Sequence, residues 1–245
     1  MPKDIHSGYY NIFRPPYSLE SKYYLSSIYC VSDRFNTVLI MIPLVPAFYK
    51  DAINIAKNHI ARKIYLIAPD IGVAFASDYY LTWDTITNTL RKSCKIVSKY
   101  MIENYARSDF KSDIIRTEND NISFDVPRSD LDIGTIDITF TKNLVHSSAP
   151  YSCDVILNDT ISTKLFVGEM NMNKADYLNK NRDLYDEIHM AFITGNYGGM
   201  TYNEVIKSYP LLVNKIYCNQ FASSEELSYA KFKRILIGGE YNDTI

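Results

Sequence analysis

The sequence predicts an α+β fold: an antiparallel β-sandwich with flanking helices and an extended N-terminal arm, in a single domain of residues 1–245. Two observations lead to this prediction. Several short segments in series alternate apolar and polar residues, and helical spacing occurs before and after them. Strands grouped in this way favour an antiparallel arrangement over a βαβ repeat. With 47% apolar and 22% charged residues, the composition is that of a globular domain.

Residues 1–24 are expected to form the extended arm. The region is rich in Tyr and Pro, and Gly8 and Pro15 disfavour a long helix. The whole chain has 21 Tyr against 11 Phe, and Tyr gathers at surfaces that other proteins cover. The arm is therefore predicted to lie against other subunits, with these candidate assembly residues: Tyr9, Tyr10, Tyr17, Tyr23 and Tyr24.

The first half of the chain is predicted to contain strands and two helices. Strand-forming residues cover 24–42 and 63–68, and a short helical pattern lies between them at 47–61. The clearest helical spacing covers residues 82–105, where apolar residues recur every three or four positions. Amphipathic packing is the expected role of this helix.

Strand signals dominate the middle third of the chain. A hairpin is predicted over residues 114–127, a strand over 134–141 and a second hairpin over 151–170. Helical spacing returns over residues 177–193 and 202–221.

The last third carries two local signals. Thr201 and Glu204 match the capping box that satisfies free amides at a helix start. Pro210 should end or kink the helix that follows. A final strand and turn are expected over residues 235–241.

Charge and hydropathy argue against nucleic acid and membrane partners. The formal net charge of −2 provides no general attraction for phosphate backbones. The longest apolar run, residues 37–49, is interrupted by Pro43 and Pro46 and falls short of the roughly 20 residues that a membrane helix needs. No specific nucleic-acid or membrane binding is expected.

The cysteines and the N-terminus favour a reducing compartment. The first residues lack the apolar segment of a secretory signal. Cys30, Cys94, Cys153 and Cys218 are isolated in sequence, so buried free thiols are expected in place of disulfides or zinc ligands.

The sequence contains no pattern typical of a catalytic or metal site. His6, His59, His146 and His189 show no metal-ligand spacing, and each is expected to be a surface or structural residue. No nucleophile motif is present. The prediction is therefore a protein that is not an enzyme, with no catalytic residue, no metal and no required cofactor.

One loop keeps an alternative open. Glycines before a helix start can let a phosphate approach the free amides. The loop lacks a Walker A motif, so a plain turn is the main expectation, and a nucleotide-binding viral or cellular enzyme is the alternative. The residues concerned are Gly195, Gly198, Gly199 and Thr201.

The chain resembles the polyhedrins of cypoviruses (cytoplasmic polyhedrosis viruses). The resemblance rests on length, on the Tyr-rich composition and on the order of elements, with the helix over 82–105 followed by strands and then helices. The hairpins over 114–127 and 151–170 are similar to segments of that family. So is the helix from Tyr202, with Cys218 near its end.

The resemblance implies a structural matrix protein of viral occlusion bodies. Such a protein forms homotrimers that pack into an intracellular crystal, embeds virus particles in the cytoplasm of the infected host cell, and dissolves at alkaline pH. Family members carry an N-terminal helix that clamps neighbouring trimers, whereas Pro2, Gly8 and Pro15 here favour an extended arm. The family's nucleotide binding has no matching motif in this chain, so any bound nucleotide is unknown.

Overall fold

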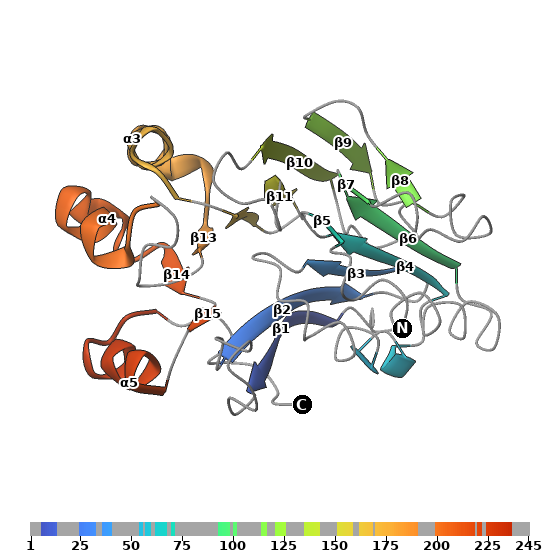
Figure 1. Ribbon diagram of the computed structural model, residues 1–245, viewed down its shortest axis with the longest axis horizontal. Coiled ribbons are helices and arrows are strands. Elements are labelled where there is room, and N and C mark those ends of the chain that lie inside the picture. Colours follow the sequence, from blue (N-terminus) through green and yellow to red (C-terminus); the bar gives the residue numbers. More distant parts are fainter. Residues whose placement is uncertain are drawn as a thin grey trace.

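A computed structural model gives the structure of the residue ranges that follow (Figure 1). The described residues are 6–13, 25–32, 36–40, 54–55, 57–59, 62–67, 70–71, 93–98, 100–101, 114–116, 121–125, 135–142, 151–158, 162–168, 170–190, 199–218, 220–221 and 224–236. Strands and helices are both present, which confirms the mixed α and β content expected from the sequence.

The first sheet has seven strands in the order β1-β2-β3-β4-β6-β8, with β15 paired to β2. Pairing is antiparallel from β1 to β3 and parallel from β3 to β8. The strands are β1 (His6–Phe13), β2 (Leu25–Ser32), β3 (Asn36–Ile40), β4 (Lys63–Ile67), β6 (Ser93–Ser98), β8 (Ile114–Arg116) and β15 (Gln220–Phe221).

The second sheet has six strands in the order β14-β13-β12-β11-β10-β9. Pairing is antiparallel from β9 to β12 and parallel from β12 to β14. The strands are β9 (Asn121–Asp125), β10 (Thr135–Lys142), β11 (Tyr151–Asn158), β12 (Thr163–Val167), β13 (Glu187–Met190) and β14 (Ile216–Cys218). A separate parallel pair joins β5 (Asp70–Ile71) to β7 (Tyr100–Met101).

Three helices with two short 3-10 turns form a layer at one end of the molecule (Figure 1). Helices α3 and α4 connect parallel strands of the second sheet, because parallel neighbours need a crossover rather than a tight turn. The elements are α3 (Met172–Lys180), η5 (Arg182–Leu184), α4 (Tyr202–Ser208), η6 (Pro210–Leu212) and α5 (Ser224–Phe232).

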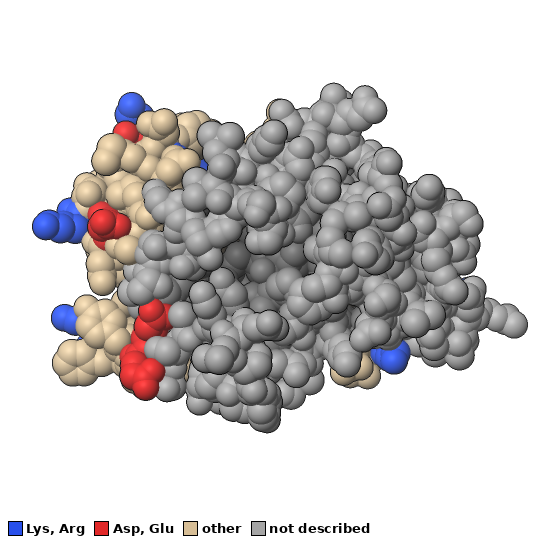
Figure 2. Space-filling model, in the orientation of Figure 1, with Lys and Arg blue, Asp and Glu red and all other residues tan. Residues whose placement is uncertain are grey.

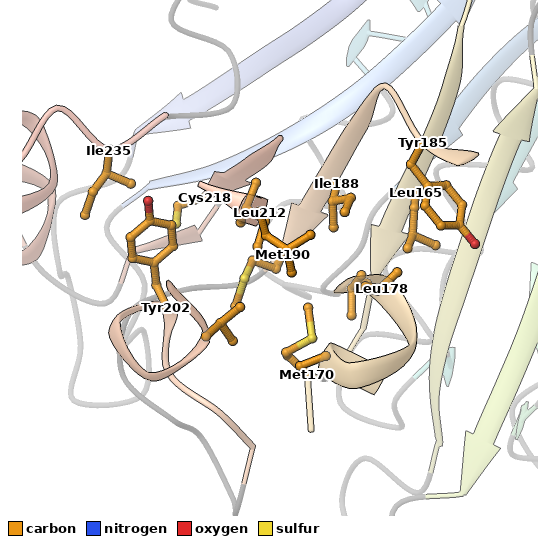
Figure 3. Packing of buried hydrophobic residues seen from close by; sticks show 14 of the residues in the cluster. Leu165, Met170, Leu178, Tyr185, Ile188, Met190, Tyr202, Leu212, Cys218 and Ile235 are labelled. Atoms are coloured by element: carbon orange, nitrogen blue, oxygen red, sulfur yellow. The ribbon is translucent and has the colours of Figure 1, made fainter. Parts of the chain in front are cut away.

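Strand β12 is buried on both of its faces, because it lies between two hydrophobic clusters. Leu165 and Val167 point to the helices and join a cluster with α3, α4 and the parallel strands (Figure 3). Phe166 points the other way and joins a cluster that also contains residues of β2, β3, β4, β10 and β11. Residues of both sheets therefore share one buried cluster.

Close packing at the end of β12 requires a glycine. A Cβ on Gly168 would lie 2.5 Å from the backbone oxygen of Cys153 in the neighbouring strand β11. The Gly168 N–H donates to the Asp154 carboxylate at 2.9 Å, and Asp154 also pairs with Lys174 of α3 at 2.7 Å. These contacts attach the first turn of α3 to the sheet.

Several predicted elements are confirmed. The strands over 63–68 and 134–141 correspond to β4 and β10, and the hairpin over 151–170 corresponds to the antiparallel pair β11 and β12. The predicted strand over 24–42 is two strands, β2 and β3, which pair antiparallel. Of the short helix over 47–61, the described residues include helical positions at 54–55 and 57–58.

The prediction of an antiparallel sheet is only half right, because each sheet also contains parallel pairs. The sequence places a helix over 177–193, but α3 ends at Lys180 and residues 187–190 form strand β13. A four-residue strand is too short for its spacing to separate it from a helix, and Ile188, His189 and Met190 are all buried, so its exposure does not alternate either.

The predicted helix over 82–105 is wrong in its described part. Residues 93–98 form β6, a strand with parallel neighbours on both sides, and 100–101 form β7. Tertiary pairing overrides the helical spacing of Cys94 and Val97. Residues 82–92 lie outside the described residues.

The predicted hairpin over 114–127 is also wrong. Strand β8 pairs with β6 in the first sheet, whereas β9 pairs with β10 in the second. The Asn- and Asp-rich segment between them is therefore a crossing between sheets. Its composition indicates a turn but not which strands it joins.

Residues 6–13 of the predicted arm are extended, as strand β1, and pair along their whole length with β2 of the same chain. Predictions nearer the C-terminal end need correction. The helix over 202–221 ends at Ser208, before Pro210 as expected, and 216–218 form β14. Residues 235–236 form no strand, and the rest of the predicted final strand lies outside the described residues.

Candidate functional site

Two of the predicted assembly tyrosines, Tyr9 and Tyr10, lie in strand β1. Tyr9 and Tyr10 are opposite Tyr29 and Ile28 in the register of the β1–β2 pair. Tyr17, Tyr23 and Tyr24 lie outside the described residues. The contact of the arm with other subunits stays a prediction.

The start of helix α4 is occupied by a carboxylate of its own chain. The Thr201 N–H donates to Glu204 Oε2 at 2.7 Å, and the Glu204 N–H donates to Thr201 Oγ1 at 3.1 Å. These bonds hold the pKa of the exposed Glu204 carboxyl below its usual range. Gly199 is half-buried, whereas Gly195 and Gly198 lie outside the described residues. Glu204 therefore already supplies the negative charge that a phosphate would bring.

Replacing Thr201 with alanine should lower the free energy of unfolding by about 1 kcal/mol, because it removes the capping oxygen. Urea denaturation of the purified variant measures this loss. Thr201→Ser keeps the oxygen and is the matched control, which should stay within about 0.5 kcal/mol of the wild type. Equal losses in the two variants would show that the capping box does not stabilise α4.

Three of the four cysteines are buried free thiols, as predicted: Cys30, Cys153 and Cys218. Burial raises the pKa of the Cys30 and Cys218 thiols well above the usual range, so both stay protonated at neutral pH. Cys30 Sγ lies 3.6 Å from His59 Nε2, a contact between a protonated thiol and a ring nitrogen. Such a pair is unsuited to nucleophilic chemistry.

Three ionisable residues on β12 and β13 form a charged cluster beneath the first sheet. Lys164 Nζ lies 3.3 Å from Glu187 Oε1, and His189 Nε2 lies 2.9 Å from Glu187 Oε2. Their side chains are 14%, 26% and 0% exposed, respectively. Glu187 therefore joins a partly exposed cation to a fully buried imidazole.

The surroundings of this cluster determine the protonation states of Glu187 and His189. Burial raises the pKa of Glu187, but the hydrogen bond from His189 and the charge of Lys164 outweigh it and lower that pKa to about 2. Burial lowers the pKa of His189 more than the Glu187 carboxylate raises it. The imidazole is thus neutral at pH 7, and Nε2 carries the proton that bonds to ionised Glu187.

Aromatic rings surround the cluster. The His189 ring stacks between Phe166 and Tyr217, with both centroid distances 5.0 Å. Lys164 Nζ lies 5.4 Å from the ring centroid of Tyr29 in the first sheet. A fully buried, sandwiched imidazole cannot reach a substrate, so the cluster holds the sheets together and does not form an accessible catalytic site.

The sequence predicts a surface or structural role for His189, and its place in the core agrees with the structural one. The sequence does not indicate Lys164 and Glu187 as site residues. No spacing relates them, because they meet only when β12 and β13 pair in parallel, with Lys164 opposite Glu187. Among the described residues no group of three His, Cys, Asp or Glu could hold a metal ion.

The second candidate is a set of exposed apolar side chains on the helical layer, called the exposed apolar surface below. The set comprises the exposed large apolar residues of α3, α5 and the turns after α3 and α4: Met172, Tyr177, Leu184, Leu211, Val213, Tyr229 and Phe232. Phe232 is 81% exposed, Met172 64% and Leu211 63%. In Figure 2 the described part of this end, at left, is mostly uncharged, with basic side chains at its outer rim and acidic groups between them and the grey part.

A lysine ammonium group lies over two aromatic rings of this surface. Lys233 Nζ lies 5.8 Å from the ring centroid of Tyr229 and 5.9 Å from that of Phe232. Both rings remain accessible to a partner, since Tyr229 is 41% and Phe232 81% exposed.

No helix in the described part of the chain is long and apolar enough to span a membrane.

The chain was compared with known proteins. No family model and no curated protein matches it. Three solved structures are similar over most of their length: the apo chemotaxis sensor ODP from T. denticola, the short form of human tRNase Z, and a B3 metallo-β-lactamase with an active-site glutamic acid.

These similarities are weak. Sequence identities are 11%, 7% and 10%, covering 96%, 88% and 85% of this chain and 98%, 91% and 85% of the other chains. The TM-scores are 0.39, 0.39 and 0.36, so the similarities carry no conclusion about fold or function.

Proposed function

We propose that this protein is a structural protein that self-assembles through exposed contact surfaces and has no enzymatic activity. The observation that carries this proposal is the exposed apolar surface of the helical layer, where Phe232, Leu211 and Met172 are each more than 60% exposed. Single exposed apolar residues are normal, but a series of them on one layer is typical of a surface that another protein covers.

The chemistry of the described core supports the same proposal. Among the described residues, the shifted pKa values of Glu187, His189 and the Cys30 and Cys218 thiols are all explained by packing inside the protein. Perturbed groups at catalytic sites normally face a cleft. Here they face the interior between strands, where they contribute to stability.

The finer form of the proposal rests on the resemblance to cypovirus polyhedrins. In that form the two sheets make a β-sandwich, the protein trimerises and packs into a crystal in the cytoplasm of the infected cell, and the crystal embeds virus particles. Copies of the same chain are the main partners. The nucleotide-binding alternative is weakened by Glu204, whose carboxylate occupies the start of α4.

Mass measurement by size-exclusion chromatography with light scattering tests the coarse proposal. Wild-type protein should form oligomers at micromolar concentration. The double variant Leu211→Ser and Phe232→Ser should associate at least tenfold more weakly, since burying each of these side chains is worth roughly 1.5–3 kcal/mol. Asn203→Ser, an exposed polar change on α4, is the matched control and should associate normally.

Microscopy of expressing cells tests the finer form. Expression of the chain without other viral components should produce refractile polyhedral bodies. A wild-type protein that is monomeric at 100 micromolar or higher, and forms no particles in cells, would contradict the proposal in both forms.

A further inference from the structure

Strand β1 forms one edge of the first sheet. It pairs antiparallel with β2 from His6 to Phe13, and no described strand pairs with its other edge (Figure 1). An edge strand presents a row of N–H and C=O groups that can pair with another chain. At eight residues, β1 is long enough to form a complete ladder with a partner.

The other edge strands of the two large sheets are shorter, charged or covered. Strand β8 has three residues and contains Arg116, and β9 has five residues and contains Asp125. Strand β14 has three residues, and the Cys218 N–H at its end donates to the Leu236 carbonyl at 2.9 Å. Each of these edges has one of the features by which proteins prevent edge-to-edge pairing.

Strand β1, at eight residues, is longer than each of these edges. Its sequence, HSGYYNIF, contains no Lys, Arg, Asp, Glu or Pro. Tyr9, Tyr10, Ile12 and Phe13 have high β propensity and bury large areas when a neighbour covers them. Of the described edges, β1 is therefore the one suited to pairing with a second strand.

We propose that β1 pairs antiparallel with β1 of a second copy of this chain, about a twofold axis that continues the first sheet across the two subunits. The inference rests on the proposed self-assembly and names one of its contacts. An antiparallel pair of identical strands is self-complementary: if residue i of one copy pairs with residue j of the other, then residue j of the first copy pairs with residue i of the second. Centred pairing places Tyr9 opposite Tyr10 and Gly8 opposite Asn11.

A second copy is the occupant that this strand fits best. The strand contains no Lys, Arg, Asp or Glu, so it offers no pattern of these charges to select a different partner or to repel its own copy. Gly8 has no side chain, so it leaves room for the Asn11 side chain of the other copy. Two larger side chains would crowd each other at this position. A strand of another protein would fit the same edge. The experiment below separates pairing with a second copy from pairing with another protein.

The test places a lysine in this edge. Asn11→Lys brings two like charges into each symmetric interface, close to the twofold axis, and should weaken association at least tenfold. Ser123→Lys is the matched control, because Ser123 is exposed in the edge strand β9. That control should associate as the wild type does. Circular dichroism confirms that both variants are folded.

Amide hydrogen exchange gives the second measurement. Residues 6–13 should become better protected as the concentration of wild-type protein rises, and should not do so in Asn11→Lys. A synthetic HSGYYNIF peptide should compete with association, whereas a scrambled peptide of the same composition should not. Equal competition by both peptides would show an unselective strand-binding edge and overturn the proposal of a second copy.

The failure of this inference differs from the failure of the proposed function. Protein that associates normally, but with unchanged exchange over residues 6–13 and no effect of Asn11→Lys, would overturn the β1 contact and leave self-assembly intact. Protein that stays monomeric at every concentration would overturn both.

Discussion

Replacing Glu187 with alanine should lower the free energy of unfolding by about 3 kcal/mol, because it leaves a largely buried cation without its counter-ion. Glu187 lies 3.3 Å from Lys164 Nζ and accepts a hydrogen bond from His189 at 2.9 Å. Lys164 is 14% exposed, so water replaces the lost carboxylate only in part. Urea denaturation at pH 7 measures the change.

The matched control is Asp183→Ala on the surface. Asp183 is 84% exposed and lies 3.9 Å from both Arg182 Nε and Lys215 Nζ, so it also has two cations nearby. Because water screens exposed pairs, its loss should cost less than about 1 kcal/mol. If Glu187→Ala costs no more than this control, the buried cluster does not stabilise the fold.

A double variant separates an unpaired charge from lost packing. Lys164→Met combined with Glu187→Leu removes both charges and fills similar space, so it should recover most of the stability that Glu187→Ala loses. The pH dependence gives an independent check. Because the pKa of Glu187 is lowered from 4.5 to about 2, its ionised carboxylate stabilises the folded state fully above pH 4.5. This stabilisation is lost as the pH falls towards 2. Glu187→Ala should lack this acid-dependent loss.

The sequence predicted the elements whose signals are local. The strand over 134–141 was recognised because Ile136 and Ile138 alternate with more polar neighbours, and both are buried on one face of β10. The capping box at Thr201 and the helix end before Pro210 were recognised because backbone chemistry decides them within one turn.

The errors lie where distant pairing decides the structure. Strands β6 and β13 are short and both have parallel neighbours on two sides, so the pairing that makes them strands is absent from their own sequences. The segments 114–116 and 121–125 resemble a hairpin but belong to different sheets. Nothing in their sequence specifies which neighbours they choose.

The charged cluster was missed for the same reason. Lys164 and Glu187 are 23 residues apart and meet because α3 returns the chain to a parallel neighbour of β12. In sequence each is one charged residue among many. The one available signal was His189 between Ile188 and Met190 in an apolar segment, which pointed to a buried histidine without identifying its partner.

The folded protein should lose stability in alkali, because it buries tyrosines in the core of the helical layer. Burial, followed by the neighbouring Tyr177 and Asp154, raises the pKa of Tyr185 to about 12. Burial and the nearby Cys218 thiol raise the pKa of Tyr202 to about 12. Both rings belong to the cluster between the second sheet and the helices (Figure 3).

The sign of the effect follows from linkage. The unfolded chain releases these phenolic protons near pH 10, whereas the folded chain holds them to about 12. Their contribution to stability is therefore complete below pH 10 and is lost as the pH rises through 12. Each tyrosine should account for about 1–2 kcal/mol of this loss.

The double variant Tyr185→Phe and Tyr202→Phe should accordingly show a weaker fall in stability between pH 9 and 11.5 than the wild type. The quantity to compare is the slope of stability against pH, measured by urea denaturation, because loss of the Tyr185 hydroxyl also changes stability at neutral pH. Tyr229→Phe removes an exposed hydroxyl and is the matched control. A slope unchanged by the double variant would show that these two phenols do not govern alkaline stability.

This result would also separate two causes of alkaline disassembly. If phenols of the arm such as Tyr9 and Tyr10 break contacts between subunits, particles should dissolve at a pH where the released protein is still folded. If Tyr185 and Tyr202 act first, dissolution and loss of near-ultraviolet circular dichroism should coincide, and the double variant should shift both to higher pH together. The helical layer would then have two roles. Its exposed apolar surface would contact other subunits, and the tyrosines buried beneath that surface would set the pH at which the layer unfolds and the contact is lost.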